Sequence, residues 1–204
     1  MRVWGDRYSR ELQRYTLARR MLGLQARTQT VSVWAGLPKR SVRTLNRSHG
    51  WSQLASNLRH GPAPTSVAHF LRSPIARMEA AVFAGLFRAF HLLPERPLRN
   101  RALDLPSVER GERLCDAFEM YRSLVPDSTM SMEQAILILT ESVPGGDLVA
   151  ERCIECGCAM VMERYGTPRK LCGGCFDAAV HRSALGLTSA SERTATGSSP
   201  PASL

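Results

Sequence analysis

Apolar residues recur at helical spacing through the first fifty residues and predict three short helices. Ser9 is placed to cap the first helix, which is expected to run to about Leu24. The second helix is expected over 29–35 and the third over 40–47. The first helix should bury one apolar stripe, made of Leu12, Tyr15, Ala18 and Leu22.

The strongest helical pattern covers residues 74–92. Ser73 is a good N-cap, and Pro74 suits the first position of a helix. Apolar residues surround this helix almost completely, so we expect it to lie in the core or at a subunit interface, and the pattern alone favours both equally. The residues concerned are Ile75, Met78, Ala81, Val82, Phe83, Leu86, Phe87, Ala89 and Phe90.

Two more helices are predicted in the middle of the chain. Ser107 should cap the first, with Leu114, Phe118 and Tyr121 on its inner face. A capping box, in which a serine is followed three residues later by glutamine, marks the start of the second helix at Ser131.

The pattern changes after Pro144, where only short elements are expected. Strands are predicted at 159–165 and 169–172, and a last short helix at 175–184. The fold class that follows is mainly α, with a small C-terminal zinc ribbon held by four cysteines. The predicted domains are a helical DNA-binding and partner-binding domain at 1–148, a zinc-ribbon segment at 149–187 and a disordered tail at 188–204, which is rich in Ser, Thr, Ala, Pro and Gly.

Cysteine spacing carries the clearest chemical signal. Cys153 and Cys156 form one pair, Cys172 and Cys175 form another, and fifteen residues separate the inner two. Two such pairs are typical of a structural zinc site, in which four thiolates fill every coordination position. The prediction is one Zn2+ per chain, held by these four residues as a structural and not a catalytic ion.

Two cysteines lie outside the predicted zinc site, and disulfides are an alternative to that site. Cys158 is interpreted as a free thiol that points away from the metal, although its position leaves open that it replaces Cys156 as a ligand. Cys115 lies in a helical pattern and is interpreted as a small core residue. Disulfides are the alternative to zinc, but the arginine-rich start of the chain does not resemble a secretion signal, so we expect a cytoplasmic protein with reduced thiols.

Positive charge is concentrated in the first third of the chain. The 204 residues carry a net charge of +9, yet residues 1–72 alone reach +11, with 13 basic side chains against Asp6 and Glu11. A solvated basic surface would not usually exclude acidic residues so completely. The distribution favours a polyanionic partner, above all nucleic acid, and no apolar run is long enough to span a membrane.

The segment from Val31 to Asn46 has the pattern of a helix-turn-helix. A small residue, Ala35, stands where two helices must approach, Gly36 suits the turn, and Leu37 can fill the gap between the helices. Val42 and Leu45 should face inward. An ordinary helical hairpin with a basic face is the alternative, and the positive charge of this region favours DNA.

Candidate DNA contacts are assigned by position. Residues early in a recognition helix usually contact bases, and arginine matches guanine while asparagine matches adenine. Flanking arginines are better placed for phosphate. The predicted set is Lys39, Arg40, Arg43 and Asn46 on the second helix of the motif, with Arg27, Arg47 and Arg59 as the candidates for phosphate contact.

An enzyme is the less favoured class of function. The histidines are scattered, none pairs with a nucleophile or a second metal ligand, and there is no glycine loop for phosphate. They are His49, His60, His69, His91 and His181. A zinc-ribbon adaptor that binds protein or RNA remains the alternative to a promoter-binding protein.

Several segments resemble the FlhC family, the flagellar master transcriptional activator subunits of bacteria. The similarity covers about residues 10–182. It is carried by Gly23–Arg27 followed by the turn and basic helix, by the loop Arg59–Pro64 before a long apolar helix, by Ala117–Arg122, and by the cysteine frame. Cys158 and the Ser/Pro-rich tail are departures from that family.

The resemblance implies a partner and a function. FlhC subunits assemble with FlhD, a small helical protein, into a ring-like hetero-oligomer that binds upstream of flagellar class II promoters and recruits σ70 RNA polymerase. It implies zinc on the same four cysteines and a DNA-binding surface largely on this subunit. It also favours the subunit-interface interpretation of the helix at 74–92.

Overall fold

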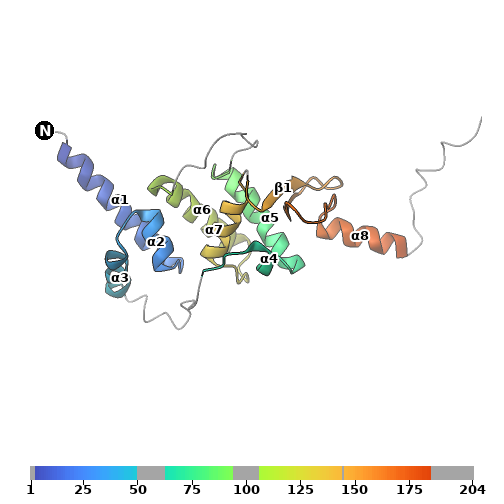
Figure 1. The fold of residues 1–204 in the computed structure, drawn as a ribbon, viewed down its shortest axis with the longest axis horizontal. Coiled ribbons are helices and arrows are strands. Elements are labelled where there is room, and N and C mark those ends of the chain that lie inside the picture. The colour runs from blue at the N-terminus through green and yellow to red at the C-terminus, as the bar shows by residue number, and fades with distance from the viewer. Residues whose placement is uncertain (1–2, 50–62, 94–105, 144, 185–204) are drawn as a thin grey trace, which may run out of the picture.

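The computed structural model describes residues 3–49, 63–93, 106–143 and 145–184. Figure 1 shows an elongated molecule, with α1, α2 and α3 at one end, α4 to α7 in the middle, and a β-hairpin followed by α8 at the other end. The helices are α1 (Val3–Gly23), α2 (Thr28–Ala35), α3 (Lys39–Ser48), α4 (Val67–Phe70), α5 (Pro74–Ala89), α6 (Val108–Leu124), α7 (Met132–Glu141) and α8 (Gly173–Ala184), and the strands are β1 (Leu148–Arg152) and β2 (Ala159–Glu163). The mainly helical fold class is therefore confirmed.

The first helix differs from its prediction at the N-terminal end. It begins at Val3, so Ser9 lies inside the helix and does not cap it. Of the expected stripe, Ala18 and Leu22 are buried, but Leu12 and Tyr15 are exposed. The physical reason is that the first half of α1 projects beyond the rest of the molecule, where no other described element covers it (Figure 1).

Helix α5 forms part of the core in the middle of the molecule. Its predicted start is confirmed, because the Ser73 hydroxyl accepts a hydrogen bond from the Ala76 amide and Pro74 follows. Phe83 and Phe87 are fully buried, and the Phe83 ring stacks on the Tyr121 ring of α6 with centroids 3.9 Å apart. These two phenylalanines are therefore core residues and not an interface.

The outer side of α5 is also apolar. Ile75 and Met78 are 68% and 65% exposed, and Val82 is partly exposed one turn further on. The expected stripe along this helix thus exists, but in this chain its first half faces solvent while the phenylalanines face the core.

Helices α6 and α7 match their predictions closely. Ser107 caps α6 through the Arg110 amide, and the capping box of Ser131 and Gln134 is complete in both directions. Leu114, Phe118 and Tyr121 are buried on the inner face of α6 in the expected way. Cys115 is fully buried beside them, so its assignment to the core is confirmed.

Two charged contacts fix the N-terminal helices on the middle of the molecule. The Arg20 guanidinium of α1 donates to Glu112, Asp116 and Glu119 of α6 at 2.6–2.7 Å. Hydrogen bonds to Glu119 and then to Asp116 and Glu112 raise the pKa of Arg20, so its charge is permanent. Glu133 of α7, almost completely buried, reaches the start of α2 and accepts a hydrogen bond from the Arg27 amide at 2.7 Å.

The hairpin corrects the predicted strands. β2 confirms the strand expected from residue 159, but its antiparallel partner is β1, which pairs Leu148 with Glu163 and Arg152 with Ala159. Residues 169–172 form no strand. Leu148 and Val161 are buried in the same core as α5, and the Arg88 side chain donates to the Ala150 carbonyl at 3.3 Å. β2 packs against α5, and β1 forms before the first cysteine because it pairs with β2.

Some expectations fall outside the described residues. The predicted DNA contact Arg59, the loop around it, and the tail at 188–204 lie there. The short helix α4 was not predicted, since it has only four residues. No helix in the described part of the chain has the length and apolar character needed to cross a membrane.

Candidate metal centre and candidate nucleic-acid interface

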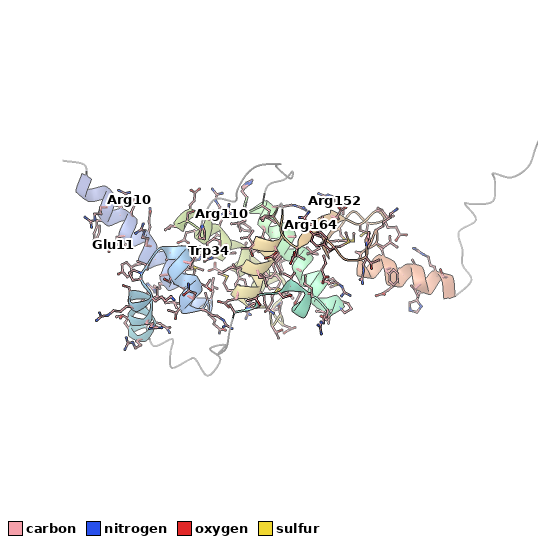
Figure 2. All side chains as sticks on the ribbon, viewed as in Figure 1. Arg10, Glu11, Trp34, Arg110, Arg152 and Arg164 are labelled. Atoms are coloured by element: carbon pink, nitrogen blue, oxygen red, sulfur yellow. The ribbon has the colours of Figure 1, made fainter. Side chains whose placement is uncertain are left out.

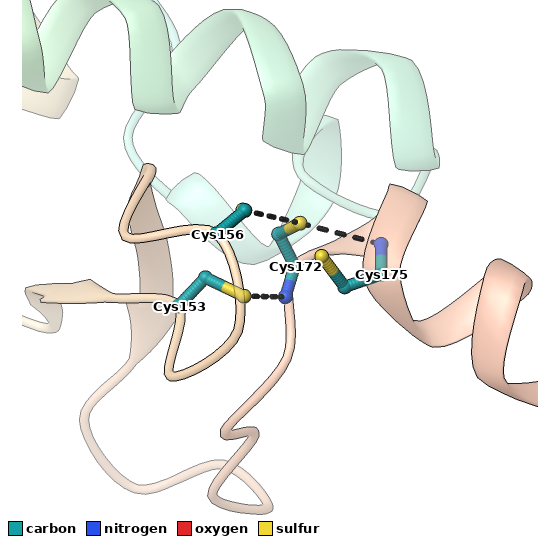
Figure 3. A group of neighbouring side chains, drawn as sticks. All are labelled: Cys153, Cys156, Cys172 and Cys175. Carbon is teal, nitrogen blue, oxygen red and sulfur yellow. Dashed lines mark hydrogen bonds between the residues drawn. The ribbon is translucent and has the colours of Figure 1, made fainter. Parts of the chain in front are cut away.

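Four cysteines from two separate segments converge at the end of the hairpin (Figure 3). Cys153 directly follows β1 and Cys156 lies in the turn after it, while Cys172 precedes α8 and Cys175 lies in its first turn. All four sulfur atoms lie within 4.8 Å of one another. The predicted residues are therefore brought together, and they can hold a metal ion.

The spacing of the sulfur atoms suits tetrahedral coordination. A tetrahedral ion with bonds of about 2.3 Å to sulfur separates its ligands by about 3.8 Å. The Cys156 and Cys172 sulfur atoms are 3.7 Å apart. Because all four ligands are thiols and belong to the chain, such an ion would have no position left for a substrate.

Backbone hydrogen bonds hold the two cysteine segments in place. The Cys153 amide donates to the Cys158 carbonyl and the Gly157 amide donates to the Cys153 carbonyl, both at 2.9 Å, and these bonds close the first turn. Gly157 has a φ of 69°, a left-handed conformation that favours glycine. The Ile154 amide donates to the Lys170 carbonyl at 3.1 Å and joins the two segments.

The protonation of these thiols is uneven. Backbone hydrogen bonds, first from Cys156 and then from Cys172, lower the pKa of Cys153 to about 6. The Cys175 amide lowers the pKa of Cys172, whereas the neighbouring Cys156 side chain raises the pKa of Cys175. Without a metal, the cluster therefore shares protons unequally among its sulfur atoms. A bound cation would displace them, because thiolates are the ligands.

Cys158 is a free and exposed cysteine, as the sequence predicted, and the outward direction of its thiol stays a prediction. The neighbouring Cys156 side chain, followed by burial, raises the pKa of Cys158 to about 12. The left-handed turn at Gly157 lets the chain double back, so residues on either side of it can face the same way. Cys158 is nevertheless outside the group of four sulfur atoms that surround one point.

Helices α2 and α3 have the geometry that the sequence predicted for a helix-turn-helix. Gly36 ends α2 with a φ of 64°, and the Ser32 hydroxyl donates to the Leu37 carbonyl across the turn at 2.7 Å. Ala35, Leu37 and Val42 are buried between the helices, and α1 packs against both. The three helices form one unit in which α3 lies at the surface (Figure 1).

The outer face of α3 is strongly basic. Lys39, Arg40, Arg43 and Arg47 are all exposed, and Asn46 is partly exposed. Within α3 there is no acidic residue. Four of the predicted contacts with DNA thus share one face of a single helix with Asn46 beside them.

Arg27 lies apart from that face. It precedes α2, its guanidinium is 4.0 Å from the buried Glu133 carboxylate, and its side chain is 20% exposed. This ion pair favours a structural role, and phosphate contact by Arg27 stays a prediction.

Two structurally important residues were missed by sequence reasoning. Arg20 and Glu133 contact partners about a hundred positions away along the chain, and no local pattern marks them. Comparisons with protein-family models and with curated proteins gave no match to this chain.

Proposed function

We propose that this chain is a DNA-binding transcriptional regulator that carries one structural zinc ion. The observation that supports it most is the α2–α3 unit, whose second helix presents basic side chains outward while Leu37 and Val42 fix its packing. A helix presented in this way fits the major groove of duplex DNA. The charge of the N-terminal third adds attraction to phosphates.

Residues at different positions along α3 are proposed to contact either bases or phosphates. Lys39, Arg40 and Arg43 lie in the first half of α3, where side chains reach base edges when a recognition helix enters the groove. Asn46 and Arg47 lie one turn later, with Arg47 as the phosphate contact. Arg59 remains a further candidate for phosphate contact.

DNA binding can be tested by fluorescence anisotropy. The first probe is a mixed-sequence duplex, followed by selection from a random duplex library. Arg43→Ala should lower sequence preference by about 1–3 kcal/mol at one base pair. Arg47→Ala should weaken binding to all duplexes. It should also reduce the slope of the logarithm of the binding constant against the logarithm of salt concentration by about 1.

Arg113→Ala is the control, because it removes the same charge from a partly exposed residue of α6 that lies outside the α2–α3 unit and pairs with Glu109. A chain that ignores duplex DNA but binds RNA or protein would refute the proposal in favour of the adaptor. Equal losses from Arg43→Ala and Arg113→Ala would refute the assignment of α3.

Zinc is the proposed metal because a site made only of thiolates with tetrahedral spacing suits it. Elemental analysis of the purified chain should find about one zinc per chain. Cys172→Ser should lose that zinc and become sensitive to protease between residues 153 and 184, whereas Cys115→Ala should keep it. Full zinc in Cys172→Ser would show that the ligand set is wrong.

The proposed setting follows the resemblance to FlhC. We infer a cytoplasmic activator that assembles with an FlhD-like helical subunit, acts at flagellar class II promoters and recruits σ70 RNA polymerase. The exposed stripe of Ile75, Met78 and Val82 on α5 supports a partner, since a solvated helix rarely displays such residues in a row.

Coexpression with an FlhD subunit and native mass spectrometry would test this assembly. Met78→Glu should break a complex that forms with the unmodified chain, while the exposed control Glu11→Ala should not. Promoter footprints should appear only with both subunits present. If the two proteins stay separate, the assignment of the partner is wrong.

A further inference from the structure

Helix α1 carries a row of arginines on the face that packs into the molecule further along the helix. Arg7, Arg10 and Arg14 are all exposed and follow one another at spacings of three and four residues. The same spacing continues to Leu17 and Met21, which are fully buried. Residues three and four apart lie on one face of a helix. The inner face of α1 is therefore apolar where other helices cover it and basic where α1 projects beyond them (Figure 1).

The last arginine of this row lies against the turn between α2 and α3. A methyl group placed on Gly36 would lie 3.8 Å from Arg14 Nε and 3.9 Å from Arg14 Cζ. Helix α3 begins three residues after Gly36, at Lys39. The arginine row therefore starts beside the N-terminus of the proposed recognition helix and extends from there along the projecting half of α1.

The chain leaves charge in this row available to a partner. At the other end of α1, three carboxylates of α6 hold Arg20. By contrast, neither Arg7 nor Arg14 forms an ion pair or hydrogen bond with its side chain among the residues that the structure describes. The acidic residues within α1 are Asp6 and Glu11, and both lie beside the row and not in it.

We propose that the arginine row binds the sugar-phosphate backbone of DNA next to the groove that α3 enters. This inference rests on the proposed binding of α3 to duplex DNA. A recognition helix places its N-terminal residues in the major groove, so the turn before it comes close to the strand that borders the groove. Arg14 contacts the phosphate nearest to α3, and Arg7 contacts a phosphate further out. Such contacts fix the orientation of the protein on the duplex without reading its sequence.

The length of the row sets the length of duplex that it covers. Arg7 and Arg14 are separated by about two helical turns, which is about 10 Å. One DNA strand carries a phosphate for about every 3.4 Å along the duplex axis, so the row covers about three base pairs. These base pairs lie outside those that α3 reads. The row therefore lengthens the DNA site without adding sequence preference.

A solvated basic face is the alternative interpretation of these arginines, and helix stability argues against it. The first half of α1 packs on no other described element (Figure 1), and a helical segment of that length is marginal alone in water. Solvent adds nothing that stabilises such a segment. Phosphates along the arginine row neutralise its charges and support the helix.

The test uses the full chain and the duplex selected from the random library, with fluorescence anisotropy at several salt concentrations. Arg7→Ala and Arg14→Ala should each weaken binding about three- to tenfold. Each should also lower the slope of the logarithm of the binding constant against the logarithm of salt concentration by about 0.9. Arg14→Lys keeps the charge and should recover most of the loss. Arg19→Ala is the matched control, because it removes an exposed arginine of α1 that lies outside the row, and it should bind like the unmodified chain.

A second measurement changes the DNA instead of the protein. Trimming the flanking base pairs of the selected duplex should weaken binding of the unmodified chain about three- to tenfold. The same trimming should leave the double variant, Arg7→Ala with Arg14→Ala, at its original affinity. Equal losses in both proteins would show that the row does not cover the flanking duplex.

The outcomes separate this inference from the proposed function. If Arg7→Ala and Arg14→Ala bind as Arg19→Ala does while Arg47→Ala is weakened, the arginine row is wrongly assigned and DNA binding by α3 stands. An altered base preference in Arg14→Ala, found by repeating the selection, would make Arg14 a base contact and overturn the inference. Unchanged DNA affinity with loss of the complex with FlhD would make the row a protein contact. An unmodified chain that binds no duplex overturns both proposals.

Discussion

Glu133 joins the middle of the molecule to the start of the helix-turn-helix, and its removal should be costly. The carboxylate is 4% exposed, accepts the Arg27 amide hydrogen bond at 2.7 Å, and lies 4.0 Å from the Arg27 guanidinium. It also faces the N-terminus of α2, whose first turn has no acidic residue of its own. Glu133 therefore supplies from α7 the negative charge that α2 lacks.

The magnitude follows from these contacts. A hydrogen bond to a charged acceptor contributes about 1.5–3 kcal/mol, and a charge at a helix N-terminus adds about 0.3–1 kcal/mol. The one buried methylene that Glu133→Ala removes adds about 0.8 kcal/mol. Glu133→Ala should thus lower the free energy of unfolding by about 3–5 kcal/mol. Glu133→Gln keeps the shape and one acceptor oxygen and should lose only about 1–2 kcal/mol.

Thermal unfolding followed by tryptophan fluorescence provides the assay, because Trp34 is buried in α2. For a chain of this size, 1 kcal/mol corresponds to about 2–4 °C. We expect the melting temperature of Glu133→Ala to fall by about 10 °C and that of Glu133→Gln by about 4 °C. The exposed Glu11 of α1 (Figure 2) gives the control Glu11→Ala, which should change little. If Glu133→Gln has the same melting temperature as the unmodified chain, the electrostatic contribution of Glu133 is refuted.

Two further predictions concern the turn and the core. Gly36→Ala forces a left-handed conformation on alanine and should lower the free energy of unfolding in urea by about 1–2 kcal/mol. Gly85→Ala lies on the exposed side of α5 with free space around it, and should raise the free energy of unfolding by about 0.5–1 kcal/mol. Changes of the same sign in the two variants would contradict this reasoning. Burial raises the pKa of Tyr121 to about 12, so its contribution to stability is complete below about pH 10 and is lost as the pH rises towards 12. Urea unfolding between these pH values should show a smaller decline in the free energy of unfolding for Tyr121→Phe than for the unmodified chain. An equal decline in both would refute the role of Tyr121.

Features set by neighbouring residues were predictable from the sequence. The caps at Ser73, Ser107 and Ser131 depend on residues three positions away, and all three are confirmed. The same holds for the buried positions of the α2–α3 turn and for the four cysteines, whose pair spacing reflects the geometry of a single turn.

Features set by distant packing were not predictable. β1 is a five-residue segment whose position depends on pairing with β2, which packs against α5, and nothing within it excludes a loop. Likewise, Leu12 and Tyr15 have the spacing of a buried stripe, but whether they are buried depends on where the neighbouring helices end.

Helix α8 extends from the end of the molecule opposite α1 (Figure 1), and Phe176 and Val180 on it are largely exposed. Its twelve residues are too few for a helix that persists alone in water. The cysteine cluster at its first turn and the Arg182–Glu155 ion pair must therefore stabilise this helix. If the proposed zinc is bound, calorimetry should show two separate peaks of heat absorption, a small one whose temperature moves with zinc concentration and a larger one whose temperature does not.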